Sequence, residues 1–101
     1  MKFKNYTPHP VNLNDGREFA SEGVARVSVS FSAPNEHGLV KQVFGEIEGL
    51  PNPEKDTMFI VSLLVLESSD RRDLVAPASG HPHTVRNDKG QIVSVPYFVT
   101  K

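Results

Sequence analysis

Alternation of apolar and polar residues predicts short β-strands along the first third of the chain. The segment 10–20 reads PVNL, then NDG, then REFA, which is typical of two strands joined by a turn. The segment 23–32, GVARVSVSFS, gives the clearest strand, because its apolar positions recur with a period of two. The two faces of this strand hold Val27, Val29 and Phe31 on one side, and Arg26, Ser28 and Ser30 on the other.

The middle of the chain predicts a second strand and then a strand that runs into a helix. The segment 39–49, LVKQVFGEIEG, reads as a strand that bulges at Gly45 and places Glu46 and Glu48 on one face. The segment 58–69, MFIVSLLVLESS, predicts a buried strand followed by a helix of about two turns, capped by Ser62. One continuous buried strand is the alternative, and the content of β-branched residues does not decide between them. We favour the strand followed by the helix.

The last hairpin is the strongest in the sequence. In TVRNDKGQIVSVPYFVT, residues 84–100, the NDKG turn ends on Gly90, which suits a positive φ, and Pro96 suggests an edge or a bulge. The preceding stretch, residues 68–88, reads as an irregular segment. Seven or eight strands and at most one helix predict a single domain over residues 1–101. We expect an α+β, mainly β fold, with a twisted antiparallel sheet or partial barrel and one short helix.

Composition narrows the classes of function. Of 101 residues, 38% are hydrophobic and 23% charged, an ordinary globular balance. Eleven basic and twelve acidic residues give a net charge of −1, which argues against binding to polymeric nucleic acid. Cysteine is absent, so disulfides and thiolate chemistry are excluded. The longest apolar run has nine residues and the first ten residues have no apolar core, so we expect a soluble intracellular protein without a membrane partner.

The polar segment 68–88 concentrates three arginines, three aspartates and two histidines. The guanidinium group of arginine can bind a phosphate with two hydrogen bonds, and this segment offers Arg71, Arg72 and Arg86. Asp73 or Asp88 could orient these arginines or accept hydrogen bonds from ribose hydroxyls. The segment is then one wall of a site for an anionic ligand. The alternative is a solvated loop whose ion pairs contribute about 0–1 kcal/mol each.

The remaining candidate chemistry is weaker. His81 and His83 would share a face of an extended segment and could bind a metal with Glu46 or Glu48, but such a pair in a Gly/Pro-rich loop is more often plain surface. We therefore expect no metal and no cofactor. His9, held between two prolines, is either structural or stacks on a base. No serine lies in a GxSxG motif, which a serine nucleophile would favour. Glu46 and Glu48 on one face of a strand are more typical of a solvated edge than of an acid–base pair, so we expect that the protein is not an enzyme.

Six stretches in succession resemble a family of small phage and prophage proteins. They are NYTPHPVNL at 5–13, GVARVS at 23–28, VFGEIEGLPNP at 43–53, FIVSLLV at 59–65, RRDLVAP at 71–77 and VRNDKGQIVSV at 85–95. The chain is similar to the phage anti-defence sponges, the Thoeris anti-defence protein 1 type. Proteins of that family block bacterial Thoeris immunity by sequestering its cyclic ADP-ribose signal. The likeness covers nearly the full chain.

This resemblance implies a binding protein in the cytoplasm of the infected bacterial host. It implies a homo-oligomer, either a dimer or a dimer-based hexamer, that holds the nucleotide in a pocket shared by neighbouring subunits. Some family members also bind cyclic oligonucleotides at separate sites; this chain is short for the family, which leaves the oligomer and the second site open. The family's arginine before the last hairpin corresponds to Arg86. The other candidate ligand-binding residues are Arg71, Arg72, Asp73, Asn87, Asp88, Arg26 and His9.

The sequence hypothesis is therefore a phage anti-defence protein that binds and sequesters a cyclic ADP-ribose immune signal without cleaving it. Two alternatives from other classes stay open. The chain could be a protein-binding inhibitor of a host enzyme, or a phage structural or assembly factor. A metal-assisted hydrolase that uses His81, His83 and Glu46 is a further rival.

Overall fold

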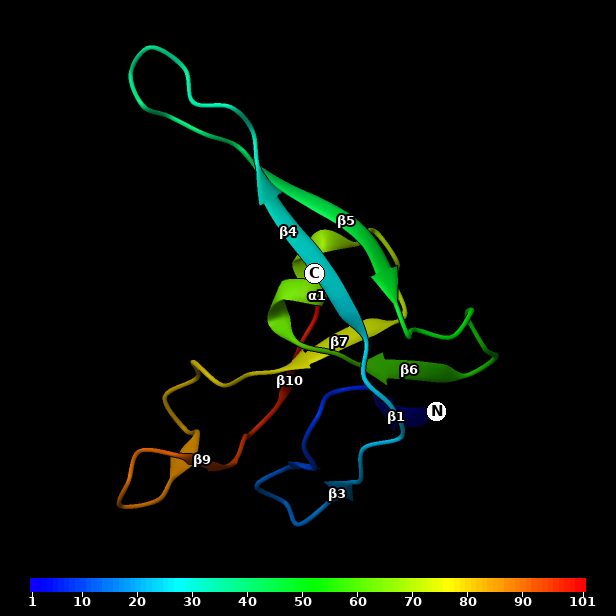
Figure 1. The fold of residues 1–101 in the computed structure, drawn as a ribbon. Coiled ribbons are helices and arrows are strands. Elements are labelled where there is room, and N and C mark those ends of the chain that lie inside the picture. Colours follow the sequence, from blue (N-terminus) through cyan, green and yellow to red (C-terminus); the bar gives the residue numbers. More distant parts are fainter.

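A four-stranded mixed sheet forms the centre of the molecule (Figure 1). β6 (Thr57–Ile60) and β7 (Leu74–Pro77) lie in its middle and run parallel to each other. β1 (Lys2–Asn5) pairs in parallel with the other side of β6, and β10 (Phe98–Val99) pairs antiparallel with β7. The computed structural model describes the whole chain, residues 1–101.

A single short helix, α1 (Leu63–Ser68), connects β6 to β7. Ser62 has extended backbone angles, and its hydroxyl oxygen accepts a hydrogen bond from the Val65 amide at 3.3 Å. This cap satisfies one of the free amide groups of the first turn and separates strand from helix. The predicted strand followed by a capped helix is confirmed. No helix in the structure has the length and apolar character needed to cross a bilayer.

Both faces of the central sheet are apolar, and each carries its own cluster. Successive residues of a strand point to opposite faces, so Phe59 and Ile60 of β6 belong to different clusters, as do Leu74 and Val75 of β7. The larger cluster, under α1, consists of Ala25, Phe59, Val61, Val65, Leu66, Leu74 and Ala76. The smaller cluster consists of Val11, Ile60 and Val75, flanked by Phe3, Phe19, Met58 and Phe98.

Three two-stranded antiparallel ribbons surround this sheet. The first and the third match predicted hairpins, and the second pairs two strands that were predicted separately. Their strands are β2 (Val11–Asn12) with β3 (Glu18–Phe19), β4 (Arg26–Phe31) with β5 (Gln42–Glu48), and β8 (Val85–Arg86) with β9 (Ile92–Ser94). Within the second ribbon, Gly45 and Glu46 together oppose Ser28, so the predicted bulge is confirmed. A side chain at Gly45 would collide with the Ser28 hydroxyl.

The predicted class, α+β and mainly β with one short helix, is confirmed, and no sheet closes into a barrel. Two features were not predicted. The central sheet is mixed rather than antiparallel, because β1, β6 and β7 run parallel. The segment 68–88 is also not irregular throughout, because its middle forms β7, where Leu74, Val75 and Ala76 are almost completely buried.

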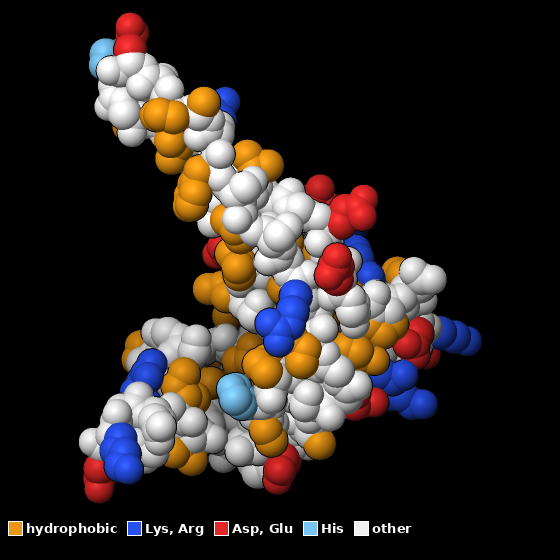
Figure 2. Space-filling view, in the orientation of Figure 1, with side chains coloured by type: hydrophobic (Ala, Val, Ile, Leu, Met, Phe, Trp, Pro, Cys, Tyr) orange, Lys and Arg blue, Asp and Glu red, His pale blue; other side chains and the backbone are white.

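The β4–β5 ribbon and its loop, residues 26–48, project from the rest of the molecule as an arm (Figures 1 and 2). The molecule measures 51 × 38 × 20 Å, and its radius of gyration is 15.5 Å. A compact chain of this length has a radius of gyration of about 13 Å. The arm accounts for this extended shape.

Candidate functional site

A cleft of about 790 Å³ lies between the β8–β9 ribbon, the segment 7–12 and the start of α1. Backbone hydrogen bonding aligns its two main walls, because the Val95 amide donates to the Asn12 carbonyl at 3.0 Å and the Asn14 amide donates to the Val95 carbonyl at 2.9 Å. Cavities of about 300–1,000 Å³ are the usual size of small-molecule sites. We call this hollow the Arg86 cleft.

Arg86 supplies the positive charge of the cleft. Its guanidinium donates from Nη1 to the Gly90 carbonyl at 2.9 Å and from Nη2 to the Ser79 carbonyl at 3.2 Å. Both acceptors are neutral, and no carboxylate pairs with this arginine. The residues that line the cleft include no aspartate or glutamate. The cleft therefore presents an uncompensated cation, which favours an anionic ligand.

His9 lies on the opposite wall of the same cleft, where its side chain is exposed. Its backbone is fixed from below by Asn5, which has no exposed surface. The Asn5 amide nitrogen donates to the carbonyls of His9 at 2.8 Å and Phe19 at 2.9 Å, and its oxygen accepts from the amide and the hydroxyl of Thr7. This buried, satisfied network holds the loop that carries His9.

The Asn5 network is the part of the site that sequence reasoning missed. The signal lay in NYTPHP, where Asn5 precedes Thr7 by two residues at the end of a strand. Asparagine side chains in such positions often hydrogen-bond to the backbone two residues onward. The Asn5 oxygen does this with the Thr7 amide at 2.9 Å.

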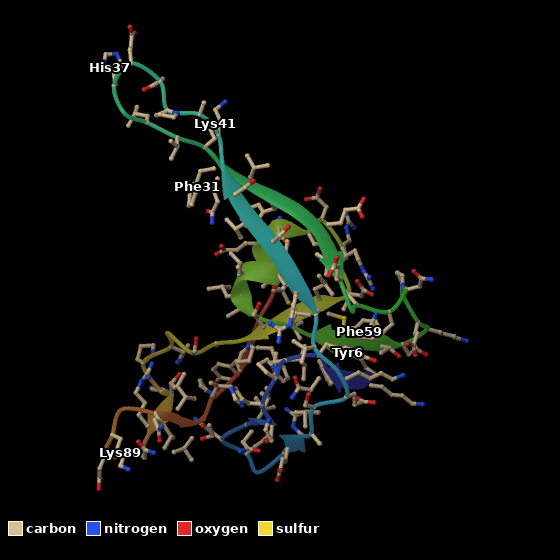
Figure 3. The ribbon with its side chains drawn as sticks, viewed as in Figure 1. Tyr6, Phe31, His37, Lys41, Phe59 and Lys89 are labelled. Atoms are coloured by element: carbon tan, nitrogen blue, oxygen red, sulfur yellow. The ribbon has the colours of Figure 1, made fainter.

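Asn87 and Asp88 form the turn that follows Arg86 and do not line the cleft. The Asn87 side-chain oxygen accepts from the Lys89 amide at 2.9 Å and the Gln91 amide at 3.0 Å. Asn87 therefore shapes the turn that presents Arg86, and Gly90 completes the turn at φ 78°. Asp88 is exposed and does not pair with Arg86. Figure 3 shows Lys89 at the tip of this hairpin.

Arg71 and Asp73 form a half-buried ion pair away from the cleft. The guanidinium donates to both carboxylate oxygens, at 2.9 and 2.6 Å, and to the Pro51 carbonyl at 2.9 Å. It also lies 5.6 Å from the centre of the Phe59 ring. The hydrogen bonds from Arg71 hold the pKa of the Asp73 carboxyl below its usual value. The pair joins the start of β7 to the segment after β5, and its groups are engaged within the protein.

The other two arginines of the candidate set lie elsewhere. Arg72 is exposed and its side chain forms no hydrogen bond or ion pair. Arg26 lines a second hollow of about 450 Å³ beside α1, together with Glu46 and Glu48. Arg26 faces Glu48 across the β4–β5 ladder, so acidic groups offset its charge there. Of the eight candidate residues, the structure brings only Arg86 and His9 into one cleft.

His81 and His83 are in a turn and not in an extended segment. Their ring centres lie 5.2 Å apart, and His81 also packs its edge against Tyr97 at 5.4 Å. The Nδ1 atom of His81 accepts a hydrogen bond from the His83 amide at 3.1 Å. No group of three or more His, Asp or Glu side chains is arranged to hold a metal ion. Glu46 and Glu48 lie on the arm and line the other hollow.

No known protein family, curated protein or solved structure matches the chain. The fold and the cleft define a small mainly β protein with an open, cationic hollow, lined by both polar and apolar groups, between one hairpin and a strand of a second hairpin.

Proposed function

We propose that the protein binds a cyclic ADP-ribose-type nucleotide in the Arg86 cleft and sequesters it without cleaving it. The observation that carries this proposal is the charge of the cleft. Its lining holds Arg86 and His9, includes no carboxylate, and leaves the Arg86 charge without a neutralising partner. The identity of the nucleotide rests on the sequence resemblance.

The cleft offers groups suited to each part of such a ligand. The guanidinium of Arg86 can bind a diphosphate with charge-assisted hydrogen bonds. His9 can stack on a base, and the hydroxyl and amide groups of Ser79, Gln91 and Ser94 can bind ribose hydroxyls. Its volume of about 790 Å³ is large enough for a ligand of this size.

The remaining candidates take supporting roles in this proposal. Asn87 fixes the turn that carries Arg86, and the Arg71–Asp73 pair braces β7. In the biological setting implied by the resemblance, the protein is made by a phage and acts in the cytoplasm of the infected host. Sequestration there keeps the immune signal from its effector.

Calorimetry with isomers of cyclic ADP-ribose tests the site. Arg86→Ala should weaken binding about 10- to 100-fold, because it removes charge-assisted hydrogen bonds worth about 1.5–3 kcal/mol. Arg72→Ala is the matched control, since it removes an exposed arginine outside the cleft, and it should bind as the parent does. Equal binding by the parent and Arg86→Ala would contradict the site.

Recovery of the ligand tests the absence of cleavage. After binding, heat denaturation should release a nucleotide whose mass and retention time are unchanged. A changed nucleotide would identify an enzyme instead. If no isomer binds the parent protein, the nucleotide proposal fails, and a protein-binding inhibitor becomes the better account.

A further inference from the structure

Asn12, the last residue of β2, carries a buried hydrogen-bond acceptor that the fold leaves unused. Its side-chain oxygen, Oδ1, has no hydrogen-bond partner in the protein. Among the side chains that are not exposed, this is the only buried nitrogen or oxygen atom without a partner. Buried polar atoms are normally paired and an unpaired one lowers stability, so this exception needs an explanation.

The fold does not need an asparagine side chain at this position. The backbone of Asn12 already joins the strands, because it pairs with Glu18 of β3 and its carbonyl accepts from the Val95 amide at 3.0 Å. The side chain adds only a contact from Nδ2 to the Val93 carbonyl at 3.5 Å, which is at the limit for a hydrogen bond. An apolar side chain of similar shape would therefore suit the fold better than this amide.

Asn12 lines the Arg86 cleft on the same wall as His9, and Arg86 lies on the opposite wall. Because Arg86 attracts the phosphates of a nucleotide, we expect its base to lie toward the wall of His9 and Asn12. The neighbouring Val11 and Val95 also line the cleft and are almost completely buried. A hydrogen bond to Asn12 in these apolar surroundings would be stronger than the same bond in water.

An asparagine amide matches one edge of adenine. Its oxygen accepts from the exocyclic amino group and its nitrogen donates to the ring nitrogen N7, a pairing that distinguishes adenine from other bases. Oδ1 of Asn12 is covered in the free protein, but the side chain as a whole is half-buried and lines the cleft. The torsion that turns a side-chain amide is soft, and the 3.5 Å contact to Val93 opposes it weakly. Rotation of the amide therefore brings both of its polar atoms to the cleft.

We propose that Asn12 is a specificity-determining residue that reads the adenine base of the bound nucleotide. Its Oδ1 accepts a hydrogen bond from the exocyclic nitrogen of the base, which gives the unpaired atom its partner. This inference rests on the proposed function, because it requires a nucleotide in the Arg86 cleft. It adds that the ligand must carry a hydrogen-bond donor on its base. An equally anionic ligand without that donor would leave Oδ1 unpaired and bind less tightly.

Replacing Asn12 by leucine separates recognition from folding, since both side chains branch at Cγ. The melting temperature of Asn12→Leu should equal or exceed that of the parent, because the variant removes an unpaired buried atom. Its affinity for cyclic ADP-ribose isomers, measured by calorimetry, should fall about 10- to 100-fold. Asn52→Leu is the control, because Asn52 is exposed and outside the cleft, and both quantities should stay unchanged. A melting temperature of Asn12→Leu well below the parent's would show that the fold needs this amide and would overturn the proposal.

Changing the base of the ligand tests the contact itself. The inosine analogue of cyclic ADP-ribose has an oxygen in place of the exocyclic nitrogen and is otherwise alike. The parent should bind the tightest cyclic ADP-ribose isomer about 10- to 100-fold more tightly than its inosine analogue. Asn12→Leu should bind the two ligands with similar affinity.

The possible failures are distinguishable. If the parent and Asn12→Leu discriminate equally between the two bases, Asn12 does not read the base and this inference is wrong. The proposed function would still stand in that case, provided that the parent binds cyclic ADP-ribose and Arg86→Ala binds it less tightly. If no isomer binds the parent, the proposed function fails and this inference fails with it.

Discussion

Arg71 and Asp73 are two residues apart, and their side chains form an ion pair with two hydrogen bonds. The ion pair is mostly shielded, with 27% of the Arg71 side chain and 18% of the Asp73 side chain exposed. Replacing Asp73 by Asn leaves the guanidinium half-buried without its counter-ion. We expect Asp73→Asn to lower the free energy of unfolding by about 1–3 kcal/mol at pH 7, measured by urea denaturation. Asp88→Asn, which removes an exposed and unpaired carboxylate, should change it by less than about 0.5 kcal/mol.

The same pair makes stability depend on pH with a defined sign. Hydrogen bonds from Arg71 lower the pKa of Asp73 in the folded protein below its usual 3.8. The stabilisation is therefore complete above that usual pKa and is lost as the pH falls through the lower, folded-state pKa. The difference between parent and Asp73→Asn should shrink as the pH falls below 3.8. A difference that stays constant down to pH 2 would contradict this linkage.

Gly49 lies at the base of the arm, where the end of β5 contacts the segment before β4. Gly49 follows β5 directly and has φ 82°. It lies so close to the segment that precedes β4 that a Cβ at this position would collide with the Val24 carbonyl oxygen. Gly49→Ala should therefore destabilise the protein by about 2–4 kcal/mol, because backbone strain adds to a collision with rigid backbone. Gly80→Ala is the control, since a Cβ there meets open space and φ is not positive.

Thermal unfolding of the two glycine variants compares these costs directly. Gly80→Ala should be neutral or stabilise by up to about 1 kcal/mol, through lower entropy of the unfolded chain. Equal melting temperatures for the two variants would mean that the approach of Gly49 to Val24 is relaxed at little cost.

Elements whose signals are local could be predicted from the sequence. The turn at 87–90, the bulge at Gly45 and the cap at Ser62 each depend on residues within a few positions of one another. β1 and β7 could not be predicted in this way, because parallel pairing with β6 joins segments far apart in sequence. The polar residues on either side of Leu74–Pro77 also obscured a buried strand of four residues.

The candidate site was predictable only in part, for the same reason. Arg86 was identified by its position before a hairpin and His9 by its flanking prolines. Their shared cleft depends on β2 lying beside β9, a contact between segments about 80 residues apart, as in the hydrogen bond from Val95 to Asn12. Proximity in sequence misled for Arg71, Arg72 and Asp73, because the buried strand β7 separates them from Arg86.

The whole molecule combines a buried centre with ribbons of low expected stability. Phe59 and Val61, around the end of β6, are fully buried, and their amides donate to Asp73 and Val75 at 2.8 Å. The β8–β9 ribbon has only two strands, and most of its residues are exposed. An isolated two-stranded ribbon is marginally stable in water. One wall of the Arg86 cleft should therefore open locally while the central sheet stays folded.

Hydrogen exchange measures this difference residue by residue. In the free protein, the amides of Phe59 and Val61 should exchange only through global unfolding, whereas the Asn87 amide, bonded to Gln91 at 2.9 Å, should exchange much faster. If a cyclic ADP-ribose isomer binds only the closed cleft, saturating ligand should slow exchange at Asn87 by the factor 1 + [L]/Kd, up to the limit set by global unfolding. The amides of the arm should respond less, because they do not line this cleft. If the ligand slows exchange in the arm and not at Asn87, the ligand binds outside the Arg86 cleft. If Asn87 and Phe59 exchange equally slowly in the free protein, the molecule unfolds as one unit and the cleft does not open locally.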